Sequence, residues 1–208
     1  MDTSNLIKWF VEIAVIVACG LTLRRYVSRK RITVKQIAFV GVISAMGIAL
    51  TSVLLIPIAP GVSIDLSHIS TFIVAIALGP FYGMITGAII GVYPMLHFAN
   101  PLLPVGKALT GLVIGLLIMR ARLVIGVESK ERTRLLRIVP TTIIGWIPEA
   151  AFVLITLGYL GLPYFLPMEV IETILVKGTG EIILLGILCE FLFASRALKT
   201  RLEAIGEN

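Results

Sequence analysis

Residues 24–58 read RRYVSRKRITVKQIAFVGVISAMGIALTSVLLIPI, and this stretch decides the fold class. A cationic run leads directly into an apolar run, and a helix needs about 20 apolar residues to cross a bilayer. The whole chain of 208 residues is 58% hydrophobic and only 14% charged, which is too apolar for a water-soluble domain of this length. The sequence therefore predicts an all-α membrane protein embedded in a lipid bilayer.

Outward from this stretch, apolar segments predict seven membrane helices. They cover residues 5–23, 36–58, 67–80, 81–97, 104–121, 137–158 and 169–195. Between the third and fourth, Pro80 removes an amide donor and disfavours a helical Gly79, so we expect a tight turn there. The chain then divides into an extra N-terminal helix with a basic linker, residues 1–35, and a six-helix membrane domain, residues 36–208.

The basic residues predict how the helices are oriented. Fifteen of the eighteen Lys and Arg residues lie in three clusters, at 24–35, 120–137 and 196–201. Loops rich in Lys and Arg stay in the cytoplasm, and placing all three clusters there forces no crossing. We therefore expect a multi-pass protein of the cell membrane with an external N-terminus and a cytoplasmic C-terminus. Topology accounts for the net charge of +6, and no nucleic-acid partner is expected.

Polar residues gather toward the predicted external side. Asp65 and His68 lie in the first external loop, and the end of the fourth segment carries Tyr93, His97 and Asn100. Asp65 or Ser67 either caps the following helix or contacts a ligand. A further candidate is Lys107, one helical turn into the fifth segment. Its side chain either reaches the membrane surface or faces a binding site.

Ionisable residues also lie deep in the last two segments. Glu149 follows Pro148 directly and lies three residues beyond Trp146, while Lys177 and Glu181 share one helix face. Such side chains are unfavourable in lipid unless they face protein or water, and they mark a functional site by default. The alternative is that Lys177 pairs with Glu181 or Glu149 and only stabilises the bundle. Both readings stay open.

The sequence offers little for catalysis. It has no phosphate-binding loop, no Ser/His pair, no HExxH motif and no metal-ligand spacing. An acid–base reaction would have to be built from Glu149, Lys177 and Glu181 alone. We therefore expect no enzymatic activity, no cofactor and no metal, and any energy must come from a partner or an ion gradient.

Small residues recur at four-residue spacing on three segments, which lets helix backbones approach closely. The three sets are Gly41, Ala45 and Ala49; Gly83, Gly87 and Gly91; and Gly111 and Gly115. Each face either packs inside the bundle or meets another subunit.

Three motifs in order resemble the substrate-binding S components of energy-coupling factor (ECF) transporters, the vitamin importers of prokaryotes. Residues 45–49, AMGIA, are similar to the AxxxA motif of the first core helix in that family. Residues 64–69, IDLSHI, are similar to its loop-and-helix run, and residues 78–83, LGPFYG, to its LGPxxG turn. The resemblance covers residues 36–196.

This resemblance implies a function without catalysis. The S component binds a water-soluble vitamin or precursor at its external side and docks on a membrane scaffold subunit shared with two ATPases. Gly41, Ala45 and Ala49 would then be docking residues, and 59–68 the gating loop. The pocket would be lined by residues that their charge and position indicate, rather than a family motif: Glu149, Lys177 and Glu181 together with Tyr93, His97, Asn100 and Trp146. The helix at 5–23 departs from the six-helix core of the family.

A second function stays open. The chain would act alone as a proton-coupled secondary transporter of a small polar metabolite, with Glu149 or Glu181 as the proton carrier.

Overall fold

The computed structural model describes residues 32–54, 56–59, 62–121, 137–195, 202 and 205. Within these residues, four helical stretches are long and apolar enough to cross a membrane: Val34–Val53, Pro80–Phe98, Leu103–Arg120 and Ile138–Leu160. The helix predicted over 5–23 lies outside the described residues, as do most residues of the three basic clusters.

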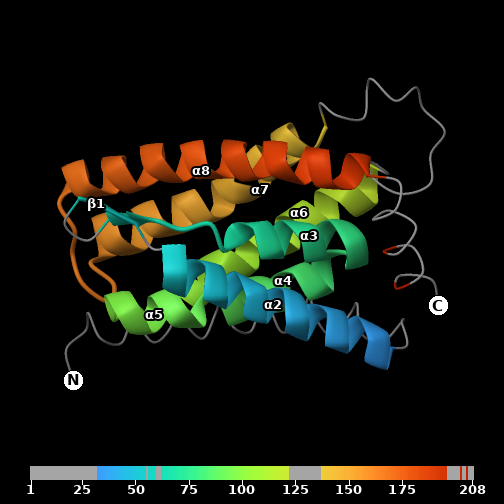
Figure 1. The fold of residues 1–208 in the computed structure, drawn as a ribbon. Coiled ribbons are helices and arrows are strands. Elements are labelled where there is room, and N and C mark those ends of the chain that lie inside the picture. Colours follow the sequence, from blue (N-terminus) through green and yellow to red (C-terminus); the bar gives the residue numbers. More distant parts are fainter. Residues whose placement is uncertain are drawn as a thin grey trace.

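The described elements are almost all helical (Figure 1). In chain order they are α2 (Val34–Leu54), β1 (Ile56–Ala59), β2 (Val62–Ile64), α3 (His68–Leu78), α4 (Pro80–Ile90), α5 (Val92–Phe98), α6 (Leu103–Ala121), α7 (Ile138–Val153), the π-helix η2 (Leu154–Leu160) and α8 (Met168–Ala194). The predicted boundaries of the last segment, 169–195, agree with α8 to within one residue at each end.

The turn predicted between the third and fourth segments is confirmed. Gly79 separates α3 from α4 and has φ 94°, a left-handed value that favours glycine, and Pro80 is the first residue of α4. Gly91 divides the segment predicted at 81–97 into α4 and α5. Its backbone angles stay helical, so the two helices follow each other as one span.

A short hairpin replaces the predicted end of the first core helix. The sequence predicts helix to residue 58, but α2 ends at Leu54 and β1 follows, paired antiparallel with β2. Pro57 disfavours continuation of the helix because it lacks an amide hydrogen for the carbonyl four residues earlier. The end of the bundle that carries this hairpin, on the left in Figure 1, is called the hairpin end below.

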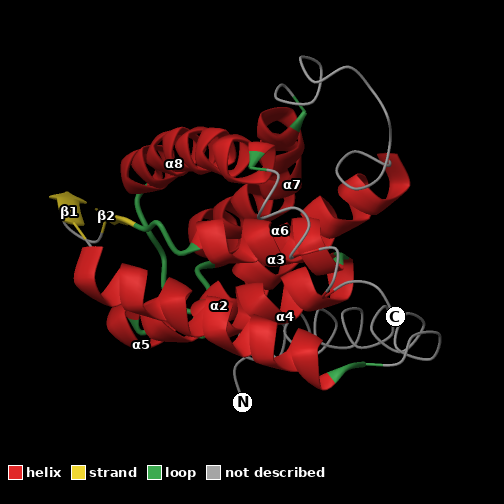
Figure 2. Ribbon diagram, turned by 45° about the vertical axis from the view of Figure 1, so that its right-hand side comes forward, coloured by secondary structure: helices red, strands yellow, loops and turns green. Residues whose placement is uncertain are grey.

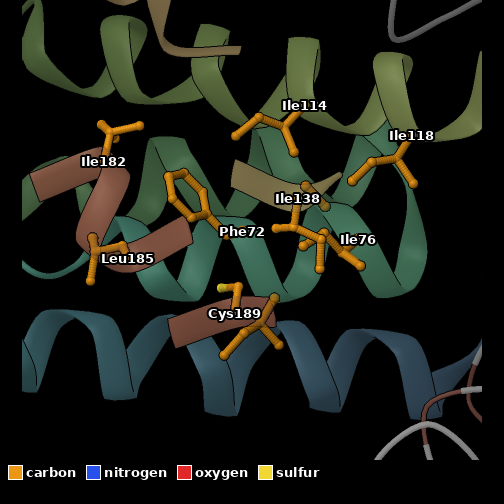
Figure 3. Packing of buried hydrophobic residues seen from close by; sticks show 10 residues of the cluster. Phe72, Ile76, Ile114, Ile118, Ile138, Ile182, Leu185 and Cys189 are labelled. Atoms are coloured by element: carbon orange, nitrogen blue, oxygen red, sulfur yellow. The ribbon is translucent and has the colours of Figure 1, made fainter. Parts of the chain in front are cut away.

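Helix α3 forms the centre of the described bundle. It contacts α2, α4, α6 and α8 (Figure 2), and ten of its eleven residues are buried. One apolar cluster joins α3 to the helices around it (Figure 3): Phe72, Ile73, Ala75, Ile76, Ile114, Ile118, Ile138, Ile182, Leu185 and Cys189. The helix is therefore shielded from lipid, and its N-terminus faces the hairpin end.

Two of the three small-residue faces pack inside the bundle. Helices α4 and α6 meet there, and an added Cβ on Gly87 or Gly111 would clash with backbone atoms of the other helix. The third face differs, because Gly41, Ala45 and Ala49 are exposed, and a Cβ on Gly41 would meet nothing within 4 Å. It therefore has no packing role among the described residues.

Candidate functional site

A cavity of about 140 Å³ opens at the hairpin end. Its walls come from β2 and the segment after it, from α3, α5, α6, α7 and α8, and from the loops before α6 and α8. Eight of the ten binding residues predicted from sequence line it: Asp65, His68, Asn100, Lys107, Trp146, Glu149, Lys177 and Glu181. The fold thus brings residues separated by more than a hundred positions into one site.

The other two predicted residues lie outside the lining. Tyr93 and His97 stack on each other, with ring centroids 6.2 Å apart, and His97 is exposed. Their neighbours Pro94 and Phe98 line the cavity instead. Residues four apart share one face of a helix. The face of α5 toward the cavity is therefore the one with Pro94 and Phe98, next to the predicted face with Tyr93 and His97.

Lys107 is buried at the centre of the site. Only 3% of the residue is exposed. Its Nζ donates to Asp65 Oδ2 at 2.6 Å, to Ser67 Oγ at 2.9 Å and to His68 Nδ1 at 3.2 Å. These contacts exclude the alternative in which this side chain reaches the membrane surface.

Asp65 anchors the segment between β2 and α3. Its Oδ1 accepts hydrogen bonds from Thr51 Oγ1 and from the amide of Ser67, both at 2.9 Å. Burial raises the pKa of this carboxyl, but the ammonium of Lys107, the ring of His68 and the hydrogen bonds from Lys107 and the Ser67 amide together hold the pKa below its usual range. Ser67 occupies the N-cap position of α3 without a capping side-chain bond. Asp65 therefore joins Thr51, the amide of Ser67 and Lys107 through one carboxylate.

We assign the tautomer of His68 from its contacts. Because the ammonium of Lys107 donates to Nδ1, that nitrogen carries no hydrogen, and the neutral ring keeps its proton on Nε2. Nε2 then donates to Glu149 Oε2 at 3.1 Å, and Thr110 donates to the same oxygen. A chain of hydrogen bonds thus connects Asp65, Lys107, His68 and Glu149 across α6, α3 and α7.

A second ion pair lies on α8. Lys177 Nζ is 3.1 Å from Glu181 Oε2 and also donates to the carbonyl of Ser63 at 2.6 Å. Glu181 Oε1 accepts from the amide of Asp65 at 2.7 Å. Both side chains therefore bind backbone groups at the end of the hairpin. The sequence left a pairing of Lys177 with Glu149 open, and the described contacts do not include it.

Aromatic side chains complete the lining. Trp146 lies against Gly178, where an added Cβ would come within 2.7 Å of the indole Cζ2. Tyr164, which also lines the cavity, donates to the carbonyl of Phe98 at 3.1 Å. Sequence reasoning missed Ser63, Tyr164 and Thr110, because a residue of a short strand, a loop residue and a helical threonine carry no periodic signal.

The contact between Trp146 and Gly178 predicts a fluorescence response. In a Trp9→Phe background, which leaves Trp146 as the single indole of the chain, Gly178→Ala should shift the emission maximum and weaken ligand binding. The reason is that the methyl group displaces the indole. Gly180→Ala is the matched control, since a Cβ there meets nothing within 4 Å. Equal spectra for the two variants would contradict this packing.

Comparison with known proteins gives one match. Residues 30–195 match the family described as the substrate-specific component of ECF transporters, and this range includes every residue of the cavity lining. No curated protein and no solved structure matches the chain.

Proposed function

The chain belongs to the family of substrate-specific components of ECF transporters, and from this premise we propose that its cavity captures a water-soluble vitamin or vitamin precursor. It is the substrate-binding subunit of an importer and a multi-pass membrane protein. The observation that carries the ligand site is the cavity itself, in which buried ionisable groups from several helices converge. Convergent polar groups in a concave, largely apolar pocket are typical of small-molecule sites.

The proposed orientation places the hairpin end outside. The basic clusters at 24–35, 120–137 and 196–201 then lie in the cytoplasm, and the N-terminal helix at 5–23 precedes a six-helix core. In this arrangement the hairpin covers the entrance and acts as the gate. Lys177 and Glu181, which bind the backbone of Ser63 and Asp65, hold it closed.

The proposed partners are a membrane scaffold subunit and two ATPase subunits. Association with scaffold and ATPase subunits is a property of the family. Gly41, Ala45 and Ala49 on α2 form an exposed strip of small side chains. We assign this strip to the scaffold contact, because small residues permit close helix approach.

Uptake by vesicles tests the function. Vesicles that contain the chain together with scaffold and ATPase subunits should accumulate the ligand that co-purifies with the chain, and ATP depletion should stop uptake. Transport by the chain alone, abolished by an uncoupler but not by ATP depletion, would instead support a proton-coupled secondary transporter.

Substitution on the exposed strip separates docking from binding. Ala45→Leu and Ala49→Leu should leave ligand affinity unchanged but reduce transport and co-purification of the scaffold at least about tenfold, because the larger side chains keep the helices apart. The matched control is Ala151→Leu, the same change at an exposed position on α7. Normal assembly of both strip variants would refute the docking assignment.

A further inference from the structure

The charges around the cavity do not balance. The lining contains three carboxylates, those of Asp65, Glu149 and Glu181, and only two ammonium groups, those of Lys107 and Lys177. With the ring proton of His68 assigned to Nε2, its imidazole adds no formal charge to the lining. The described lining therefore carries a formal charge of −1, and a positively charged ligand would neutralise it.

Few ammonium donors remain for an anionic ligand. An ammonium group has three N–H donors. Lys107 uses all three, on Asp65, Ser67 and His68. Lys177 uses two, on Ser63 and Glu181. An anion in the cavity would thus find one free ammonium donor beside three carboxylates.

Glu149 is the carboxylate of the lining without a Lys or Arg in direct contact. The residue is 7% exposed, and both of its hydrogen-bond donors, His68 and Thr110, are neutral and bind Oε2. Within the described part of the chain, no group donates to Oε1 and no Lys or Arg contacts this carboxylate. Hydrogen bonds donated to a carboxylate favour its charged form. A buried charge of this kind is stabilised when a cation binds it.

The size and the aromatic lining limit the ligand further. The cavity of about 140 Å³ is large enough to hold one aromatic ring of the size of benzene. Trp146 provides an indole, the best aromatic partner for a cation. Asn100 is 3% exposed, and its Oδ1 accepts from the amide of Leu102, which leaves its Nδ2 as a free donor among the described contacts.

From these four observations we propose that the ligand is a monocyclic organic cation, whose charged nitrogen binds Glu149 Oε1 and whose ring packs against Trp146. Asn100 would donate to an acceptor on the same ring. This inference rests on the proposed function only in taking the cavity as the substrate site of the importer.

Three planar probes of equal size and different charge test the proposal. Benzamidine is cationic, benzamide is neutral and benzoate is anionic, and all have the same number of non-hydrogen atoms. Each is titrated into the full-length protein in detergent, in the Trp9→Phe background, with Trp146 fluorescence as the readout. Benzamidine should bind at least about tenfold more tightly than benzamide, and benzoate should bind most weakly.

Glu149→Gln tests which carboxylate selects the charge. It should bring the Kd values of benzamidine and benzamide to within about threefold of each other, because the amide keeps the shape and removes the charge. Glu172→Gln is the control, since it removes a carboxylate from an exposed position of α8 outside the lining, and it should keep the wild-type ranking. If Glu149→Gln also keeps that ranking, the assignment of this carboxylate is wrong.

The outcomes separate this inference from the proposed function. Tighter binding of benzoate, or binding of none of the three probes, would overturn the cationic ligand and leave ATP-dependent uptake as a separate question. A preference for benzamidine in a chain that fails to assemble with scaffold and ATPase subunits would overturn the importer and keep the cation site.

Discussion

Lys107→Met is expected to lower the free energy of unfolding by about 3–5 kcal/mol, because it leaves Asp65 as a buried carboxylate without its cation. The two side chains are 4% and 14% exposed, so little solvent is present to replace the lost partner. The substitution also removes the donors to Ser67 and His68. Reversible unfolding with SDS in mixed micelles measures the change.

A second variant separates loss of the ion pair from loss of packing. Adding Asp65→Asn to Lys107→Met removes the orphaned charge, and the double variant should recover most of the lost stability. Lys177→Met serves as a comparison, since its ion pair with Glu181 lies within one helix and both side chains are more exposed than that of Lys107. Wild-type stability of Lys107→Met, or no recovery in the double variant, would mean that the pair is not buried as described.

The other large effect is expected at the contact between α4 and α6. Gly87→Ala places a methyl group against the backbone carbonyl of Lys107, which cannot rotate away as a side chain can. The two helices must therefore separate, at a cost of about 3 kcal/mol or more. Because this contact also positions Lys107, ligand affinity should fall together with stability. Thermal unfolding in detergent and ligand titration measure the two changes.

The control for this prediction is a glycine without neighbours. Gly180→Ala in α8 adds the same methyl group where nothing lies within 4 Å, and it should leave stability unchanged or raise it by up to about 1 kcal/mol. Equal behaviour of Gly87→Ala and Gly180→Ala would show that the helices are not held as closely as their backbones indicate.

The limits of a helix could be predicted from the sequence where a long apolar run alone determines them. A long apolar run has to be helical in lipid, because each backbone group must be satisfied within the segment. The limits of α8 and the turn at Gly79 were predicted correctly for that reason and for the chemistry of glycine and proline. The hairpin of β1 and β2 was not predicted, because a short strand pair between helices leaves no apolar periodicity.

Part of the lining of the candidate cavity could be named from the sequence. Glu149, Lys177 and Glu181 were predicted as site residues because they lie deep in apolar segments. All three line the cavity. Tyr93 and His97 were included because they lie near the same helix end as Asn100, but the rotation of α5 turns Pro94 and Phe98 toward the cavity instead. The rotation of a helix around its axis depends on its neighbours, which a uniformly apolar segment does not specify.

The sequence by itself determined that the chain is a helical membrane protein of the ECF substrate-component family, because apolar length and local motifs carry that information. Only the tertiary structure decided which charges are partners. The segment after β2 folds back onto the bundle, so Lys107 pairs with Asp65 while His68 binds Glu149. Such contacts join residues 42 and 81 positions apart, and their geometry arises from the packing of whole helices. The resulting surplus of one carboxylate is therefore a property of the fold.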